Sequence, residues 1–127
     1  IASRRQEHRV ALSVRAPDAN GPAGVQGRQP LPIGAGAVDV CLISTVLHDF
    51  VEEGVADRAL EEVARVLKPK GLLAIVEFKK IEGPPGPSVR IRLSPEEVER
   101  WVLPHGFVSL RSRVLGPYNY LVIFEKT

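Results

Sequence analysis

Methionine is absent from the 127 residues, and the chain begins at Ile1. A complete translation product begins with methionine, so the sequence predicts a processed chain or a fragment. The single cysteine, Cys41, excludes an intramolecular disulfide and favours a reducing, cytoplasmic setting. Because Cys41 lies within an apolar run, we interpret it as a small buried hydrophobe rather than a nucleophile.

Long apolar runs are also missing. None approaches the length of a membrane span, and the first residues lack the pattern of a signal peptide. Metal-ligand spacing is absent as well, because His8, His48 and His105 are scattered and there is only one cysteine. We therefore expect neither a bound metal nor a membrane partner.

The positive charge is concentrated in residues 1–29, which carry five arginines. Proline, glycine and asparagine give this segment the composition of a loop, with room for one short strand from Val10 to Val14. A nucleic-acid-binding arm is one interpretation, but the segment has no aromatic side chain to stack on a base. We interpret residues 1–29 as a basic, poorly structured segment, and we do not expect nucleic acid as a partner.

Residues 30–127 alternate strands with helices, which indicates an α/β domain. The apolar run at 38–43 is typical of a strand buried on both faces, as in a parallel sheet covered by helices. The pattern predicts parallel strands at 38–43 and 72–78, an antiparallel pair at 107–114 and 120–125, and helices at 50–67 and 95–103. Ligands in such sheets bind beyond the carboxyl ends of the parallel strands, which points to Ser44–Asp49.

Two local signals mark where helices begin. Ser94 followed by Pro95 and Glu97 predicts an N-cap, a proline in the first turn and a capping box. Asp49 is a fair N-cap for the helix expected at 50–67.

Several short motifs occur in a recognisable order. They are Leu31-Pro32-Ile33, Val38-Asp39-Val40, Val46-Leu47-His48-Asp49, Glu61 to Gly71, Leu72 to Glu77, Ser94 to Val98 and His105-Gly106-Phe107. Together they resemble the carboxyl-terminal half of a class I S-adenosylmethionine-dependent methyltransferase. The similarity is greatest to the small-molecule branch that includes ubiquinone and menaquinone biosynthesis. The resemblance implies a partial Rossmann-like sheet, S-adenosylmethionine as cofactor and a small-molecule methyl acceptor.

The resemblance also implies roles for particular residues. Ser44, Thr45, Val46 and Leu47 follow the strand that borders the methionine moiety, so they are the candidates for cofactor binding. His48 is the candidate for acid–base catalysis, the alternative being that it packs over the strand end. Asp49 and Glu77 are candidates for substrate contact. The alternatives are that Asp49 orients His48 or caps the helix, and that Glu77 is a satisfied or solvated carboxylate.

One departure from the family pattern affects the predicted function. The glycine-rich cofactor loop and the acidic residue after the next strand are missing from the sequence, which argues against activity of this chain alone. The alternative is a non-catalytic α/β remnant that serves as an interaction module. Without its usual neighbour, the strand at 38–43 would be an exposed apolar edge. We therefore expect either a homodimer through this edge or pairing of the strand with Val10–Val14.

Overall fold

The structure is a computed structural model that describes residues 11–14 and 31–127. The rest of the basic segment 1–29 lies outside the described residues, so its expected lack of structure stays a prediction. In the described part of the chain, no helix has the length and apolar character needed to cross a membrane.

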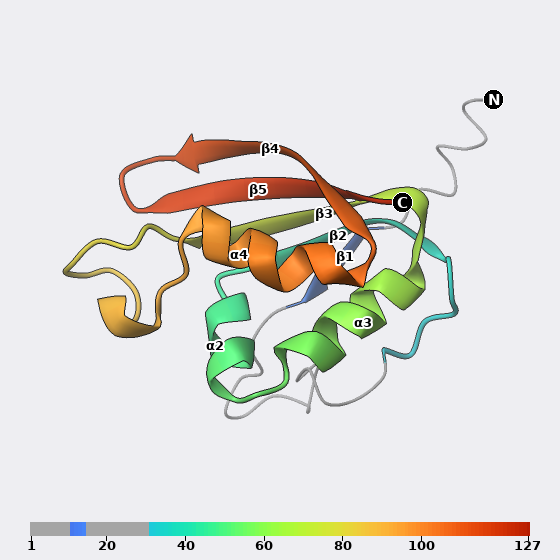
Figure 1. The fold of residues 1–127 in the computed structure, drawn as a ribbon, viewed down its shortest axis with the longest axis horizontal. Coiled ribbons are helices and arrows are strands. Elements are labelled where there is room, and N and C mark those ends of the chain that lie inside the picture. Colours follow the sequence, from blue (N-terminus) through green and yellow to red (C-terminus); the bar gives the residue numbers. More distant parts are fainter. Residues whose placement is uncertain (1–10, 15–30) are drawn as a thin grey trace.

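Five strands form one mixed sheet in the spatial order β1-β2-β3-β5-β4 (Figure 1). Their bounds are β1 Ala11–Val14, β2 Val38–Ser44, β3 Leu67–Phe78, β4 Phe107–Leu115 and β5 Asn119–Lys126. The first three strands are parallel, whereas β5 is antiparallel to both β3 and β4. The predicted α/β class, with its parallel pair and its antiparallel ending, is therefore confirmed.

The outer edge of β2 is occupied by β1. Ala11 lies opposite Val40, and the parallel register continues to Val14 opposite Ile43. Of the two expectations for this edge, the structure thus shows pairing with the short amino-terminal strand. Self-association is not needed to satisfy the backbone groups of β2 along Val40–Ile43.

The helix predicted at 50–67 is wrong in its bounds, because two helices, α2 (Leu47–Glu52) and α3 (Ala56–Val66), occupy this region. Gly54 separates them with φ +75°, and its N–H donates to the carbonyl of Val51. A left-handed residue ends a helix, and glycine adopts that conformation without a steric penalty. The region predicted as one helix is therefore divided at Gly54, and its first helix begins at Leu47, three residues before the predicted start.

The capping prediction for Asp49 is also wrong. The N-cap of α2 is Val46, and Asp49 lies inside the first turn, where its N–H donates to the carbonyl of Val46. Because the helix begins at Leu47, Asp49 is its third residue and not its N-cap, although a carboxylate in the first turn still suits the helix dipole.

The capping box at Ser94 is confirmed at the start of α4 (Pro95–Val102). The Ser94 hydroxyl accepts from the N–H of Glu97 at 3.1 Å, and the Glu97 carboxylate accepts from the N–H of Ser94 at 2.8 Å. Short 3₁₀ helices precede and follow α4, η1 at Val89–Ile91 and η2 at Leu103–His105. The left-handed Gly106 then leads directly into β4.

The helices lie in front of the sheet in the view of Figure 1, and the core lies between the two layers. Alternate strand residues are fully buried on this face: Cys41, Ile43, Leu73, Ile75, Val122 and Phe124. The intervening residues of the same strands are only half-buried: Val40, Leu42, Leu72, Ala74, Val76, Leu121 and Ile123. This alternation follows from the two-residue period of strands and identifies a second, apolar face of the sheet.

Candidate active site

The parallel strand β2 ends in a Ser44–Thr45 step with unusual backbone geometry. Thr45 has φ +52°, a left-handed conformation that is an outlier for a β-branched residue. It is held there by two bonds, from its N–H to the carbonyl of Val76 at 2.8 Å and from its hydroxyl to the carbonyl of Ser44 at 2.8 Å. Strained residues of this kind cost about 1–3 kcal/mol and cluster at ligand sites.

The four residues predicted to bind the cofactor divide into two pairs. Ser44 and Thr45 are half-buried as residues, and the Thr45 hydroxyl already donates to the carbonyl of Ser44. The side chains of Val46 and Leu47 are buried in the core, at 1% and 0% exposure. These fractions are of the whole residue, so neither the backbone nor the side chain of Val46 or Leu47 is open to a ligand.

His48 lies in the first turn of α2 and meets Glu77 of β3, 29 residues later. The imidazole Nδ1 is 2.8 Å from Glu77 Oε1, and the His48 N–H donates to Oε2 at 2.9 Å. Both side chains are buried. The structure brings these two candidates together because β2 and β3 are neighbouring parallel strands and His48 follows the end of one while Glu77 lies near the end of the other.

The Glu77 carboxylate fixes the proton of the imidazole. An ionised carboxylate only accepts hydrogen bonds, so neutral His48 carries its proton on Nδ1 and keeps the lone pair on Nε2. Burial lowers the pKa of His48, but the hydrogen bond and charge of Glu77, with the charge of Asp49, outweigh burial and the charge of Arg92. The net effect raises the pKa of His48 above its usual 6.5.

Asp49 lies on the other side of the imidazole. Its Oδ1 is 3.5 Å from His48 Nε2, and its side chain is 44% exposed. Glu77, by contrast, faces His48 and has a side-chain exposure of 1%. Of the two residues predicted to contact substrate, Asp49 is thus accessible, whereas Glu77 touches the imidazole.

Two residues beside this pair, Phe78 and Arg92, are not among the candidates predicted from the sequence. The Phe78 ring meets the His48 ring edge-on, with centroids 6.2 Å apart and an interplanar angle of 68°. The guanidinium of Arg92 lies over the same Phe78 ring, 5.5 Å from its centroid. The position of Arg92 between Ile91 and Leu93 was the one available signal, because a charge between two apolar residues can be drawn into the core with them.

The sequence of residues 10–75, just over half of the chain, matches the model of a family described as a methyltransferase domain. The chain belongs to this methyltransferase family. The matched region includes β1, β2 and the Ser44–Asp49 segment at the end of β2. None of the curated proteins compared with this sequence matches it.

Solved structures share the fold of this methyltransferase domain. A SAM-dependent methyltransferase from Aquifex aeolicus is 26% identical, with a TM-score of 0.71 over 86% of this chain, which spans 56% of that protein. A protein from Sulfolobus solfataricus described as a type 11 methyltransferase is 21% identical, with a TM-score of 0.71 over 99% of this chain and 77% of that one. The [4+2]-cyclase SpnF is 19% identical, with a TM-score of 0.63 over 81% of this chain and 55% of that one.

The donor set at the end of β2 fits one side of an S-adenosylmethionine site. Ser44 and Thr45 are half-buried and the Asp49 side chain is 44% exposed, and hydroxyls and a carboxylate are groups that can bind the polar amino-acid end of such a ligand. In the described part of the chain, no buried side-chain nitrogen or oxygen lacks a hydrogen-bond partner. No buried side chain there needs a ligand to complete its hydrogen bonds.

Proposed function

We propose that this methyltransferase domain transfers a methyl group from S-adenosylmethionine to a small-molecule acceptor, with His48 as general base. The observation that supports the proposal is the buried hydrogen bond between His48 Nδ1 and Glu77 Oε1, 2.8 Å long, at the carboxyl end of two parallel strands. Ligand sites in open α/β sheets lie at this edge. A histidine oriented by a carboxylate there is suited to remove a proton from an acceptor.

In this proposal His48 performs one step, the removal of a proton from the methyl acceptor. S-adenosylmethionine, when bound, would supply a methyl group to an acceptor oxygen or nitrogen; the carbon–sulfur bond would break and its electron pair would stay on sulfur, which leaves as S-adenosylhomocysteine. His48 Nε2 takes the proton that the acceptor loses, while Nδ1–H stays bonded to Glu77 and stabilises the imidazolium. Asp49 beside Nε2 adds a second negative charge that favours the protonated form.

The hydroxyls of the half-buried Ser44 and Thr45 would hold the cofactor on the β2 side. The finer assignment, the branch that methylates ubiquinone- and menaquinone-type small molecules, rests on the motif resemblance alone. A cyclase shares the fold, so the fold by itself does not select methyl transfer. The carboxylate–histidine pair favours an activity that includes proton removal.

Calorimetric titration of the 127-residue chain with S-adenosylmethionine tests the proposal. We expect saturable binding that is weakened in Ser44→Val, because the valine removes a hydroxyl from the end of β2. Ser112→Val on β4 is the matched control, because Ser112 is an exposed serine on another strand. Absence of binding up to about 1 mM ligand, a binding free energy of roughly −4 kcal/mol, would contradict the proposal.

A second candidate function, a non-catalytic module that forms a homodimer, is favoured by the second face of the sheet. Three adjacent strands carry half-buried apolar residues on this face, centred on the row Leu42–Ala74–Ile123. Glu125 lies at one end of the face, and Arg113, opposite Leu121, lies towards the other. A two-fold axis across the strands would bring Glu125 of one copy towards Arg113 of the second copy.

Sedimentation velocity tests this second function. The homodimer hypothesis predicts a wild-type dimer and a monomeric Ile123→Lys variant. Val114→Lys, at an exposed position on β4, is the control and should remain a dimer. A wild-type monomer at about 0.1 mM would exclude a dimer with a dissociation constant below that concentration.

A further inference from the structure

Arg92 is a buried cation whose donors all serve one segment of the chain. It follows η1 and is 3% exposed. Its guanidinium donates to five backbone carbonyls: Pro87 at 2.8 Å, Lys79 at 3.1 Å, Ile81 at 2.7 Å, Gly83 at 2.7 Å and Pro85 at 2.8 Å. A guanidinium has five N–H donors, so each donor is engaged and none is left for a ligand.

The physical chemistry of this arrangement is unusual. A buried charge is costly unless it is paired, and no carboxylate among the described residues forms an ion pair with Arg92. The five carbonyl dipoles take the place of a counter-ion. They come from a proline- and glycine-rich stretch, residues 79–87, in which neither helix nor strand fixes the backbone. Five carbonyls of this stretch therefore converge on the guanidinium of Arg92.

Two ion pairs join residues 79–91, called the segment below, to the helices. Lys80 Nζ lies 2.7 Å from Glu97 of α4, and Arg90 lies 3.9 Å from Glu52 of α2. The Arg90 pair is exposed and contributes little to stability. Arg92 thus holds the segment from inside, whereas Lys80 and Arg90 fasten it at the surface.

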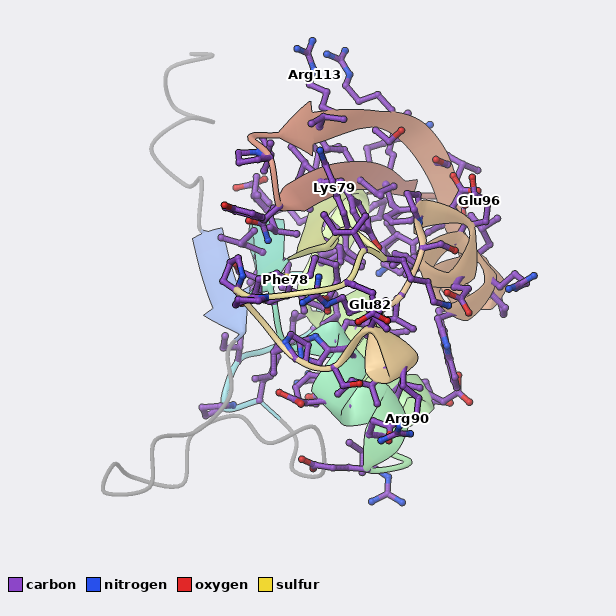
Figure 2. The ribbon with its side chains drawn as sticks, turned by 90° about the vertical axis from the view of Figure 1, so that its left-hand side faces the viewer. Phe78, Lys79, Glu82, Arg90, Glu96 and Arg113 are labelled. Carbon is purple, nitrogen blue, oxygen red and sulfur yellow. The ribbon has the colours of Figure 1, made fainter. Side chains whose placement is uncertain are left out.

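Phe78 connects the segment to His48. A Cβ built on Gly86 would lie 2.8 Å from the Phe78 ring, so the backbone of the segment packs directly on that ring. The guanidinium of Arg92 covers the ring, and the ring edge meets His48. In Figure 2, Phe78 lies close to the long connection that leads from Lys79 to Arg90. A displacement of the segment would consequently free the imidazole on this side.

We propose that Arg92 is a positioning residue that folds residues 79–91 into a fixed wall of the acceptor site and, through Phe78, holds the His48 ring. The assignment of this wall to the acceptor site rests on the proposed methyl transfer. The wall itself is a property of the free chain. Its test therefore needs neither cofactor nor acceptor.

Nuclear magnetic resonance of the labelled chain tests the wall with three variants: Arg92→Lys, Arg92→Gln and Arg90→Gln. Lysine keeps the charge but has three donors in place of five, and glutamine removes the charge as well. Arg90→Gln is the matched control, because it makes the same change in the same segment at an exposed arginine. Amide exchange at Leu73 in the sheet reports whether each variant is folded.

We expect Arg92→Lys to speed amide exchange at Ile81 and Ile91 by about tenfold or more relative to Leu73, since both amides lie in the segment that Arg92 holds. Arg92→Gln should do the same and also raise the pKa of His48, because it removes a positive charge that disfavours the imidazolium. Arg92→Lys keeps the positive charge, so a changed titration of His48 in that variant would come from a changed position of the imidazole and not from loss of charge. Arg90→Gln should leave the exchange and the titration unchanged.

Unchanged exchange at Ile81 and Ile91 in a folded Arg92→Lys protein would overturn the proposal. An equal acceleration in Arg90→Gln would also overturn it, because the effect would then belong to the segment's charge in general. If the wild-type chain fails to bind S-adenosylmethionine while these results hold, the proposed function fails and the positioning role of Arg92 stands.

Discussion

Replacement of Glu77 by glutamine removes one charge from the buried pair and keeps its size. The carboxylate accepts two charge-assisted bonds from His48, from the backbone N–H at 2.9 Å and from Nδ1 at 2.8 Å. A glutamine oxygen can accept one of them, and its amide group then faces the other donor. Loss of one such bond costs about 1.5–3 kcal/mol of unfolding free energy. The total for a domain of this kind is roughly 5–15 kcal/mol, so the change is easily measured.

The sign of the pH dependence makes this prediction specific. In the wild type the pKa of His48 is raised above 6.5, so its stabilising contribution is complete below the unfolded pKa and is lost as pH rises through the folded pKa. Burial is the largest single influence on the pKa of His48 and lowers it. In Glu77→Gln the hydrogen bond to a carboxylate and its charge, which raise this pKa, are lost, so the effect of burial prevails. The folded pKa of His48 then falls below the unfolded value, and stability increases as pH rises through that range.

Urea denaturation at about pH 5.5, 7 and 8.5 measures both effects. We expect the free energy difference between wild type and Glu77→Gln to be largest at the lowest pH and to shrink as pH rises. Glu61→Gln, at an exposed position on α3, is the control and should differ little from wild type. A pH-independent difference, or an equal loss in Glu61→Gln, would refute the assignment of the effect to the His48–Glu77 pair.

Three further predictions concern the scaffold that holds this site. Ser94→Ala removes the capping box with Glu97 and should lower the unfolding free energy by about 1 kcal/mol in thermal denaturation, and no change would argue against the cap. Phe124→Ala, at a fully buried position, should cost about 3–5 kcal/mol, whereas Val114→Ala, 67% exposed, should stay within about 0.5 kcal/mol. Burial raises the pKa of Cys41 to about 12, so a thiol reagent should react with the native protein far more slowly than with the urea-unfolded chain; equal rates would contradict burial.

The sequence predicted those features that depend on neighbours along the chain. The apolar run at 38–43 and the Ser94–Glu97 spacing carry their signal within a few residues, and both appear in the structure as β2 and the capping box. The error at 50–67 came from giving hydrophobic periodicity more weight than Gly54. Both short helices keep their apolar residues inward, so periodicity alone cannot locate the break between them.

The contacts that shape the candidate site join residues far apart in sequence. His48 and Glu77 were each candidates, but their contact depends on the parallel pairing of β2 with β3, which no local pattern specifies. Arg92 was missed for a related reason. An arginine is usually exposed, and its burial here depends on five carbonyls that gather only when residues 79–87 fold around it.

The central claim is that the carboxyl end of β2, with His48, forms the ligand side of a methyltransferase site. Titration of the isotope-labelled chain with S-adenosylhomocysteine, followed by nuclear magnetic resonance, tests it most directly. We expect the largest and saturable shift changes at the amides of Ser44–Asp49 and at the His48 imidazole, and none at the exposed strand β4. Saturable changes confined to β4, or none up to about 1 mM ligand, would contradict the claim.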